Sequence, residues 1–150
     1  MQIFDKKSRG FSLVELLVVA AIIGILIAIL VIGLSTVKNK AKDAAIQSVL
    51  WELRSAAELY YHNTSPSTYE GVCDLTDTTL SDDGDFGRIE TNIIDNGGTD
   101  IGCRCSETAY AVISSLNLGD CWCVDSLGAS RKVDLEADSC SEELETTACP

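Results

Sequence analysis

A single carboxylate, Glu15, lies in a stretch that is otherwise suited to a lipid bilayer, "SRGFSLVELLVVAAIIG" at residues 8–24. An ionised side chain near the centre of a membrane-spanning helix costs about 2.5 kcal/mol or more, so such a residue normally has a partner and a function. A matched ion pair is penalised much less than an unpaired charge in these surroundings. The position of Glu15 therefore raises the question of which group is its partner.

A second set of chemically active side chains consists of seven cysteines, all in the C-terminal part of the chain: Cys73, Cys103, Cys105, Cys121, Cys123, Cys140 and Cys149. A small cysteine-rich region behind a membrane segment indicates an oxidising, extracytoplasmic compartment, in which disulfides form. Because seven is odd, at least one thiol stays free or pairs between chains. The sequence leaves the pairing open.

Metal binding is the alternative for these side chains. Cys103-x-Cys105 and Cys121-x-Cys123 could supply four thiolates, but zinc knuckles use a wider spacing. On a strand, residues i and i+2 share a face, so each Cys-x-Cys could instead direct two sulfurs the same way. The acidic run Asp82–Asp85 lacks the spacing of an EF-hand calcium loop. We expect disulfides, with no metal and no cofactor.

The charge is distributed unevenly along the chain. The formal net charge is -12, with +2 in residues 1–10, zero in residues 11–62 and -14 in residues 63–150. A region this acidic repels phosphate backbones and anionic lipid headgroups. We therefore expect no direct binding of nucleic acid.

The elements that must position these residues begin with a membrane helix. Residues 16–34 carry no charge. As a helix, this segment is long enough to cross a hydrocarbon core of about 30 Å. Three basic residues precede this run: Lys6, Lys7 and Arg9. They predict a cytoplasmic N-terminus and an external C-terminal head. Three more mark where the helix leaves the lipid: Lys38, Lys40 and Lys42.

The helix is expected to continue beyond the membrane. Apolar residues recur at steps of three and four, as in an amphipathic helix, at Ile46, Val49, Leu50, Leu53, Ala57 and Tyr60. The first proline is Pro66. The pattern predicts one helix from about Phe11 to Tyr61, on the order of 75 Å long.

The head is predicted to hold a small antiparallel meander. Residues 63–106 have little periodicity and are expected to be mostly loop, with "FGRIETNII" at 86–94 as a candidate short strand. Three further strands are predicted at "ETAYAVISSL" (107–116), "CWCVD" (121–125) and "RKVDL" (131–135). Their apolar face would cover the helical stripe. The tail, residues 136–150, is expected to be irregular and tied down by Cys140 and Cys149 if these pair.

Three hypotheses compete for the N-terminal segment. The first is a secretory signal cleaved near Gly33-Leu34-Ser35. The second is a plain signal anchor, in which Ser12 and Glu15 form a capping box at the helix start. Capping explains a polar pair at this position, but it does not explain the Gly10-Phe11 junction before it.

The third hypothesis is a family resemblance. The stretch "RGFSLVELLVVAAIIGILIAIL" at residues 9–30 resembles the class III signal of type IV pilins and type II secretion pseudopilins. The matching parts are a basic leader (Lys6, Lys7 and Arg9) ending in Gly10, then Phe11, Ser12-Leu13 and Glu15. The resemblance implies cleavage between Gly10 and Phe11 by a prepilin peptidase that recognises this leader. It also implies N-methylation of Phe11 and retention of the apolar run.

The resemblance further implies a role for Glu15. In the family, this carboxylate pairs with the Phe11 amine of a neighbouring subunit, so that only one axial stagger matches each acid to an amine. It also implies a pilin-like α+β fold with a leader (1–10), a long helix (11–62, membrane-spanning to about 35) and an acidic head (63–150). The proline that pilins often carry in the membrane segment is missing, and Gly24 and Gly33 could take its place.

The expected function is that of a structural subunit of a type IV pilus-like surface filament for adhesion, motility or DNA uptake. Its implied partners are copies of itself, the prepilin peptidase and N-methyltransferase, an assembly ATPase and a platform protein, with the membrane as its location before assembly. The alternatives are a pseudopilin of a secretion or competence system, and an uncleaved membrane-tethered binding domain. His62 is the sole histidine, at a predicted helix end, so we expect no catalytic triad and no enzyme.

Overall fold

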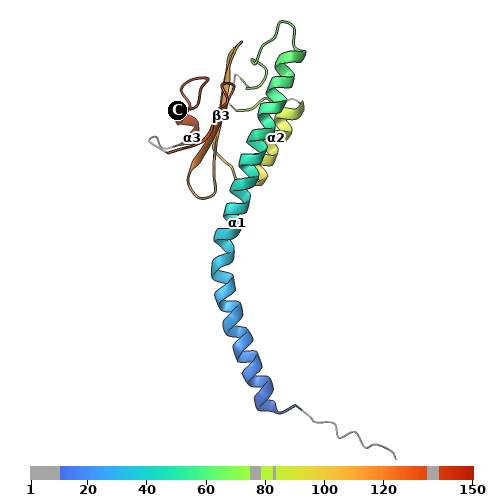
Figure 1. The fold of residues 1–150 in the computed structure, drawn as a ribbon, viewed down its shortest axis with the longest axis vertical. Coiled ribbons are helices and arrows are strands. Elements are labelled where there is room, and N and C mark those ends of the chain that lie inside the picture. The colour runs from blue at the N-terminus through green and yellow to red at the C-terminus, as the bar shows by residue number, and fades with distance from the viewer. Residues whose placement is uncertain (1–10, 75–78, 83, 135–138) are drawn as a thin grey trace, which may run out of the picture. The chain divides into compact units, whose positions relative to one another are not determined.

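A computed structural model describes residues 11–74, 79–82, 84–134 and 139–150 (Figure 1). The leader residues singled out above, Lys6, Lys7, Arg9 and Gly10, lie outside the described residues. The chain divides into two compact units, Met1–Val37 and Lys38–Pro150, and each is described by itself.

Helix α1, Leu13–Asn63, is continuous over 51 residues and contributes to both units. We refer to Leu13–Val37 as its apolar half and to Lys38–Asn63 as its head half. The sequence-based expectation of one helix from about Phe11 to Tyr61 is confirmed to within two residues at each end. Gly24 and Gly33 are both helical, so neither glycine breaks the helix. Among the described residues, α1 is the one helix long and apolar enough to cross a membrane.

The head half of α1 packs on a sheet through the predicted apolar stripe. Ile46, Leu50, Leu53 and Ala57 are fully buried. They belong to one core cluster with sheet residues that include Tyr110, Val112 and Val124. The spacing of three and four places these side chains on one side of the helix, which is why a single face can be removed from water.

The sheet has four antiparallel strands in the order β1-β2-β3-β4. They are β1 (Ile101–Cys105), β2 (Tyr110–Ser115), β3 (Cys121–Asp125) and β4 (Ser130–Val133). The last three strands and their meander were predicted. The expectation of loop up to residue 106 was wrong for β1, because this short edge strand takes its order from pairing with β2, where Cys103 lies opposite Val112.

The candidate strand at 86–94 is also wrong, because this segment lies in helix α2, Gly84–Asp95. Phe86, Ile89 and Ile93 are buried and follow one another at three- and four-residue steps. That spacing is the helical period, and it outweighs the strand preference of the β-branched side chains. In Figure 1, α2 runs alongside the head half of α1.

The C-terminal tail covers the second face of the sheet. It includes a short helix, α3 (Cys140–Glu143), whose first turn is capped by the Ser139 side chain. Cys140, Leu144 and Cys149 are buried in a second core cluster with Ile113 and Val133 of the sheet. The expectation of a wholly irregular tail is corrected by α3, and the sheet is buried on both faces.

Candidate assembly site

Glu15 lies in the first turn of α1, and its side chain turns back toward the start of the helix. One carboxylate oxygen accepts a hydrogen bond from the Ser12 backbone N–H at 3.2 Å. This contact is the glutamate half of the predicted capping box. A shallow hollow beside Glu15 is lined by Val14, Val18 and Val19. In the described part of the chain, none of the ion pairs involves Glu15.

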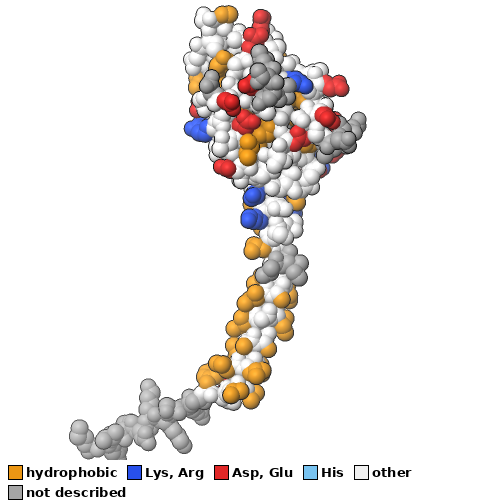
Figure 2. All heavy atoms as spheres, turned by 180° about the vertical axis from the view of Figure 1, so that it is seen from behind, with side chains coloured by type: hydrophobic (Ala, Val, Ile, Leu, Met, Phe, Trp, Pro, Cys, Tyr) orange, Lys and Arg blue, Asp and Glu red, His pale blue; other side chains and the backbone are white. Residues whose placement is uncertain are grey.

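The surface around Glu15 is apolar on every side. All the side chains of residues 11–30 and 33–37 are exposed in the isolated chain, including Phe11 at 78% and Leu30 at 71%. Figure 2 shows the hydrophobic side chains that coat this part of the helix. Exposed apolar area of this extent is stable only in lipid or against other apolar helices.

This apolar helix start corresponds to a known sequence motif. Residues 5–31 match the prokaryotic N-terminal methylation motif. This match supports the resemblance of the N-terminal segment to type IV pilins and pseudopilins. The chain is also 37% identical over 68 residues to the type II secretion system core protein G of Pectobacterium carotovorum subsp. carotovorum. That alignment covers 44% of each chain, so the match spans less than half of the relative's length. No solved structure matches this chain.

The residues of the pilin-like processing site can be placed in part. Phe11 is described and lies two residues before Leu13, the first residue of α1, where it is exposed to solvent. Gly10 and the leader lie outside the described residues, so cleavage, methylation and leader recognition stay predictions. The pairing of Glu15 with a neighbouring Phe11 amine is likewise a prediction.

The cysteines of the head form three disulfides: Cys73–Cys103, Cys121–Cys140 and Cys123–Cys149. The expectation of disulfides is confirmed, but the idea that Cys140 pairs with Cys149 is wrong. Each of these two residues is bonded to a cysteine of β3 instead, so the tail is attached to the sheet rather than to itself. Cys121 and Cys123 direct both sulfurs toward the tail, as expected for residues i and i+2 of a strand.

Cys105 is the free cysteine, and it is partly buried. Its thiol donates a weak hydrogen bond to the Glu70 carbonyl at 3.4 Å. Burial raises the pKa of this thiol and the Glu70 charge raises it further, while the Cys73 backbone N–H opposes the shift. The protonated form therefore dominates at neutral pH, which makes Cys105 a weak nucleophile.

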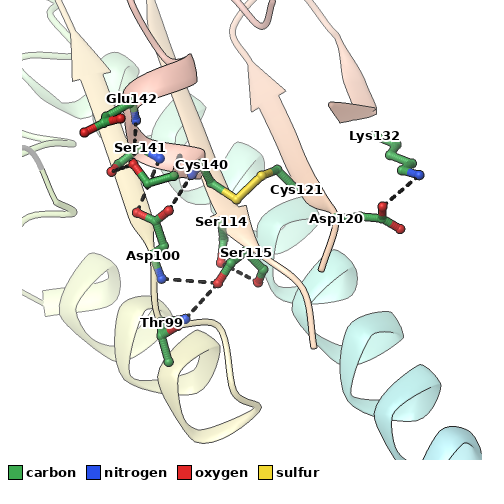
Figure 3. The surroundings of a disulfide bond; sticks show 11 residues. Thr99, Asp100, Ser114, Ser115, Asp120, Cys121, Lys132, Cys140, Ser141 and Glu142 are labelled. Carbon is green, nitrogen blue, oxygen red and sulfur yellow. Dashed lines mark hydrogen bonds and ion pairs between the residues drawn. A yellow bond between two sulfur atoms is a disulfide. The ribbon is translucent and has the colours of Figure 1, made fainter. Parts of the chain in front are cut away.

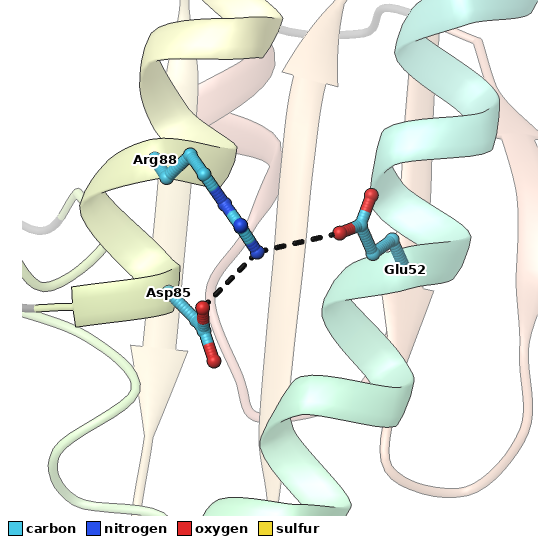
Figure 4. A network of polar contacts seen from close by, with 3 residues as sticks. All are labelled: Glu52, Asp85 and Arg88. Atoms are coloured by element: carbon cyan, nitrogen blue, oxygen red, sulfur yellow. Dashed lines mark hydrogen bonds and ion pairs between the residues drawn. The ribbon is translucent and has the colours of Figure 1, made fainter.

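The candidate cation ligands are separated or already paired. Within the described ranges, no group of three or more His, Cys, Asp or Glu side chains is arranged to hold a metal ion. Asp83 of the Asp82–Asp85 run lies outside these ranges. Asp85 forms an ion pair with Arg88 at 3.0 Å, and Arg88 also contacts Glu52 of α1 at 3.6 Å (Figure 4). These three side chains are exposed, so their pairing adds little stability.

Two buried or half-buried carboxylates that the sequence analysis did not single out hold the tail in place. Asp100 accepts hydrogen bonds from the backbone N–H groups of Cys140 and Ser141, next to the Cys121–Cys140 disulfide (Figure 3). Asp125 accepts from the N–H groups of Ala129 and Cys149, at 2.8 and 3.0 Å. No sequence pattern distinguishes Asp100 and Asp125 from the acidic residues that are exposed to solvent.

A third carboxylate links α1 to the sheet. Asp43 is only 6% exposed, and one of its oxygens accepts from both the backbone and the side-chain N–H groups of Asn117, at 2.6 and 2.8 Å. The Asn117 side chain also donates to the Asn96 carbonyl at 2.9 Å. The start of the head half is thereby tied to the β2–β3 turn and to the end of α2.

Proposed function

We propose that this chain is a structural subunit of a pilin-like filament, held in the membrane by the apolar half of α1 before it is assembled. The observation that carries the proposal is the N-terminal methylation motif, which overlaps the apolar half of α1, where the described side chains are exposed on all sides. Lateral packing of such helices removes their apolar surface from water once the subunit has left the lipid. This role requires no catalytic residue and no cofactor.

The proposed assembly contact joins Glu15 to a second copy of the chain. Hydrolysis of the Gly10-Phe11 peptide bond releases the leader and leaves a cationic amine on Phe11. The Ser12 N–H occupies one oxygen of Glu15, which leaves the carboxylate able to accept from a neighbouring amine as well. Apolar contact between neighbouring helices supplies affinity but allows many relative positions along the helix axis. The ion pair between Glu15 and the Phe11 amine can form at only one of these positions.

The proposed partners follow from the resemblance to type IV pilins and pseudopilins. They are the prepilin peptidase and N-methyltransferase that process Gly10-Phe11, and the assembly ATPase and platform protein that drive polymerisation. The N-terminus would face the cytoplasm before assembly, and the head would lie outside it. Three disulfides in the head are consistent with an oxidising compartment.

Two assemblies are proposed for the finished polymer. The first is a surface filament for adhesion, motility or DNA uptake. The second is a secretion pseudopilus, which the similarity to a type II secretion system core protein G favours. Electron microscopy of sheared cells, with mass spectrometry of the sheared fraction, separates the two. If the chain is a pilus subunit, it is expected to be found in long surface filaments. If it is a pseudopilin, deleting it is expected to abolish protein secretion while surface filaments remain.

Intact-mass measurement of the protein from cells tests the proposal directly. We expect a chain that has lost residues 1–10 and gained one methyl group on Phe11. Changing Gly10 to a bulky residue is expected to leave the full-length form, because the peptidase no longer recognises the junction. A full-length wild-type chain that stays in the membrane as a monomer would contradict the proposal and favour a tethered binding domain.

A further inference from the structure

Three lysines follow the apolar half of α1 within five residues: Lys38, Lys40 and Lys42. We call them the lysine collar. Lys38 and Lys40 are exposed and Lys42 is partly exposed. At 100° per residue, Lys38 and Lys42 share one side of the helix and Lys40 lies on the other. The collar thus presents positive charge around the helix rather than along one face. Figure 2 shows basic side chains gathered on α1 where the apolar coating ends.

Within the described residues, no carboxylate forms an ion pair with the collar. None of the three lysines forms an ion pair within residues 11–74, 79–82, 84–134 and 139–150, whereas Arg88 and Lys132 of the head do. The nearest carboxylate in the sequence, Asp43, is buried and accepts two hydrogen bonds from Asn117. The charge of the collar is therefore available to an outside partner.

The spacing along α1 indicates where that partner lies. The uncharged stretch from Leu16 to Val37 rises about 33 Å as a helix, close to the thickness of a hydrocarbon core. Lys38 follows directly, so in the proposed membrane-inserted state it lies at the depth of the phosphate groups. Lysine side chains reach from such a position into the headgroup layer, because their apolar stems stay along the helix while the ammonium groups meet water and phosphate.

We propose that the lysine collar binds the phosphate groups of anionic phospholipids in the leaflet that faces the head. Residues 63–150 carry a net charge of -14, which by itself repels such lipids. The collar offsets that repulsion at the one level where the chain contacts headgroups, and it holds the helix at a defined depth before assembly. This inference rests on the proposed membrane-inserted state.

Energy transfer from tryptophan to labelled lipid tests the proposal with the full chain. The protein is reconstituted at low ionic strength into phosphatidylcholine vesicles that contain a small fraction of dansyl-labelled phosphatidylglycerol or dansyl-labelled phosphatidylcholine. With Trp122 changed to Phe, the donor is Trp51, which lies nine residues beyond Lys42 on α1, about 14 Å along the helix, and reports on the leaflet at the collar. We expect labelled phosphatidylglycerol to be enriched around the protein by roughly fivefold or more over labelled phosphatidylcholine.

Matched variants identify the side chains responsible. Changing Lys38, Lys40 and Lys42 together to Gln is expected to bring the enrichment ratio to one, while changing all three to Arg is expected to keep it. The preference is also expected to decline at high salt.

Two results would overturn the proposal. One is an equal transfer to both lipids in the wild type. The other is carbodiimide cross-linking of the collar to carboxylates of a second copy without lipid preference, which would assign the collar to contacts between heads. Flotation with pure phosphatidylcholine vesicles separates these outcomes from failure of membrane insertion. A chain that does not float contradicts the proposed function, while one that floats without lipid preference contradicts the collar alone.

Discussion

The two halves of α1 share one continuous helical backbone but meet different surroundings. In the head half, Ile46, Leu50, Leu53 and Ala57 are fully buried against the sheet, while the opposite face is exposed. In the apolar half, every described side chain is exposed in the isolated chain. The head half therefore completes its packing within one molecule, whereas the apolar half can complete it only with lipid or with other copies. One length of α1 therefore stabilises the fold of the head, while the other length leaves its apolar surface unburied within the single molecule.

The largest expected effect comes from removing the charge in the apolar half. Glu15→Ala is expected to abolish filaments while cleavage and membrane insertion persist, because the Phe11 amine of a neighbour loses its partner in a low-dielectric setting. Filaments are scored by electron microscopy and processing by intact mass. Glu52→Ala, which removes an exposed acid of the head half, is the control and is expected to leave filaments intact. Normal filaments in Glu15→Ala cells would refute the register role.

The second prediction contrasts one leucine from each half. Leu50→Ala is expected to lower the free energy of unfolding of the head by about 2–5 kcal/mol, since the residue is fully buried and its removal leaves a cavity. Leu30→Ala is expected to leave that free energy unchanged, because Leu30 is 71% exposed. Urea titration of the detergent-solubilised chain, followed by near-ultraviolet circular dichroism, measures both. Equal losses in the two variants would contradict the division of α1.

A third, smaller effect is expected at the junction of the head half with the sheet. Asp43→Ala leaves two N–H groups of Asn117 without their acceptor and is expected to cost about 1–3 kcal/mol. Asp43→Asn keeps an acceptor oxygen and is expected to cost less. The same urea titration compares them. If Asp43→Ala matched the wild type, the Asp43–Asn117 contact would contribute nothing to docking the β2–β3 turn.

The smallest expected effect is a pH dependence confined to the head. Burial, reinforced by the Glu58 carboxylate, raises the pKa of Tyr110 from its ordinary value of 10.0 to about 12. Because the folded state favours the protonated phenol, its contribution is fully present below pH 10 and is lost as the pH rises from 10 toward 12. Thermal melts across this range are expected to show falling stability, while α1 in the membrane is unaffected.

The variant Tyr110→Phe tests whether Tyr110 causes the loss of stability at alkaline pH. The Tyr110 hydroxyl is buried, and in the described part of the chain it has no hydrogen-bond partner. Its removal is therefore expected to leave stability at neutral pH unchanged or slightly higher. The variant should also lose less stability than the wild type between pH 10 and 12. An identical alkaline decline in both proteins would assign the effect to other groups.

Much of this fold could be predicted because its signals are local. The stripe from Ile46 to Tyr60 has the helical period, and three of the four strands have β-branched residues between turn residues. The errors arose where two local signals conflicted. In α2, the isoleucines favoured a strand, but their spacing of three and four residues determined a helix. Strand β1 has a glycine and an arginine among five residues and is ordered by its neighbour.

The sequence by itself determined the apolar segment, the methylation motif and the placement of Glu15 within it, because each depends on residues close together in the chain. Only the tertiary structure decided the disulfide pairing, the identity of Cys105 as the free thiol, and the roles of Asp43, Asp100 and Asp125. The bonded cysteines lie 19 to 30 residues apart, and Asp43 lies 74 residues from Asn117. Such contacts form because the sheet brings together segments that are distant in the sequence. Local composition does not indicate which of these segments will be in contact.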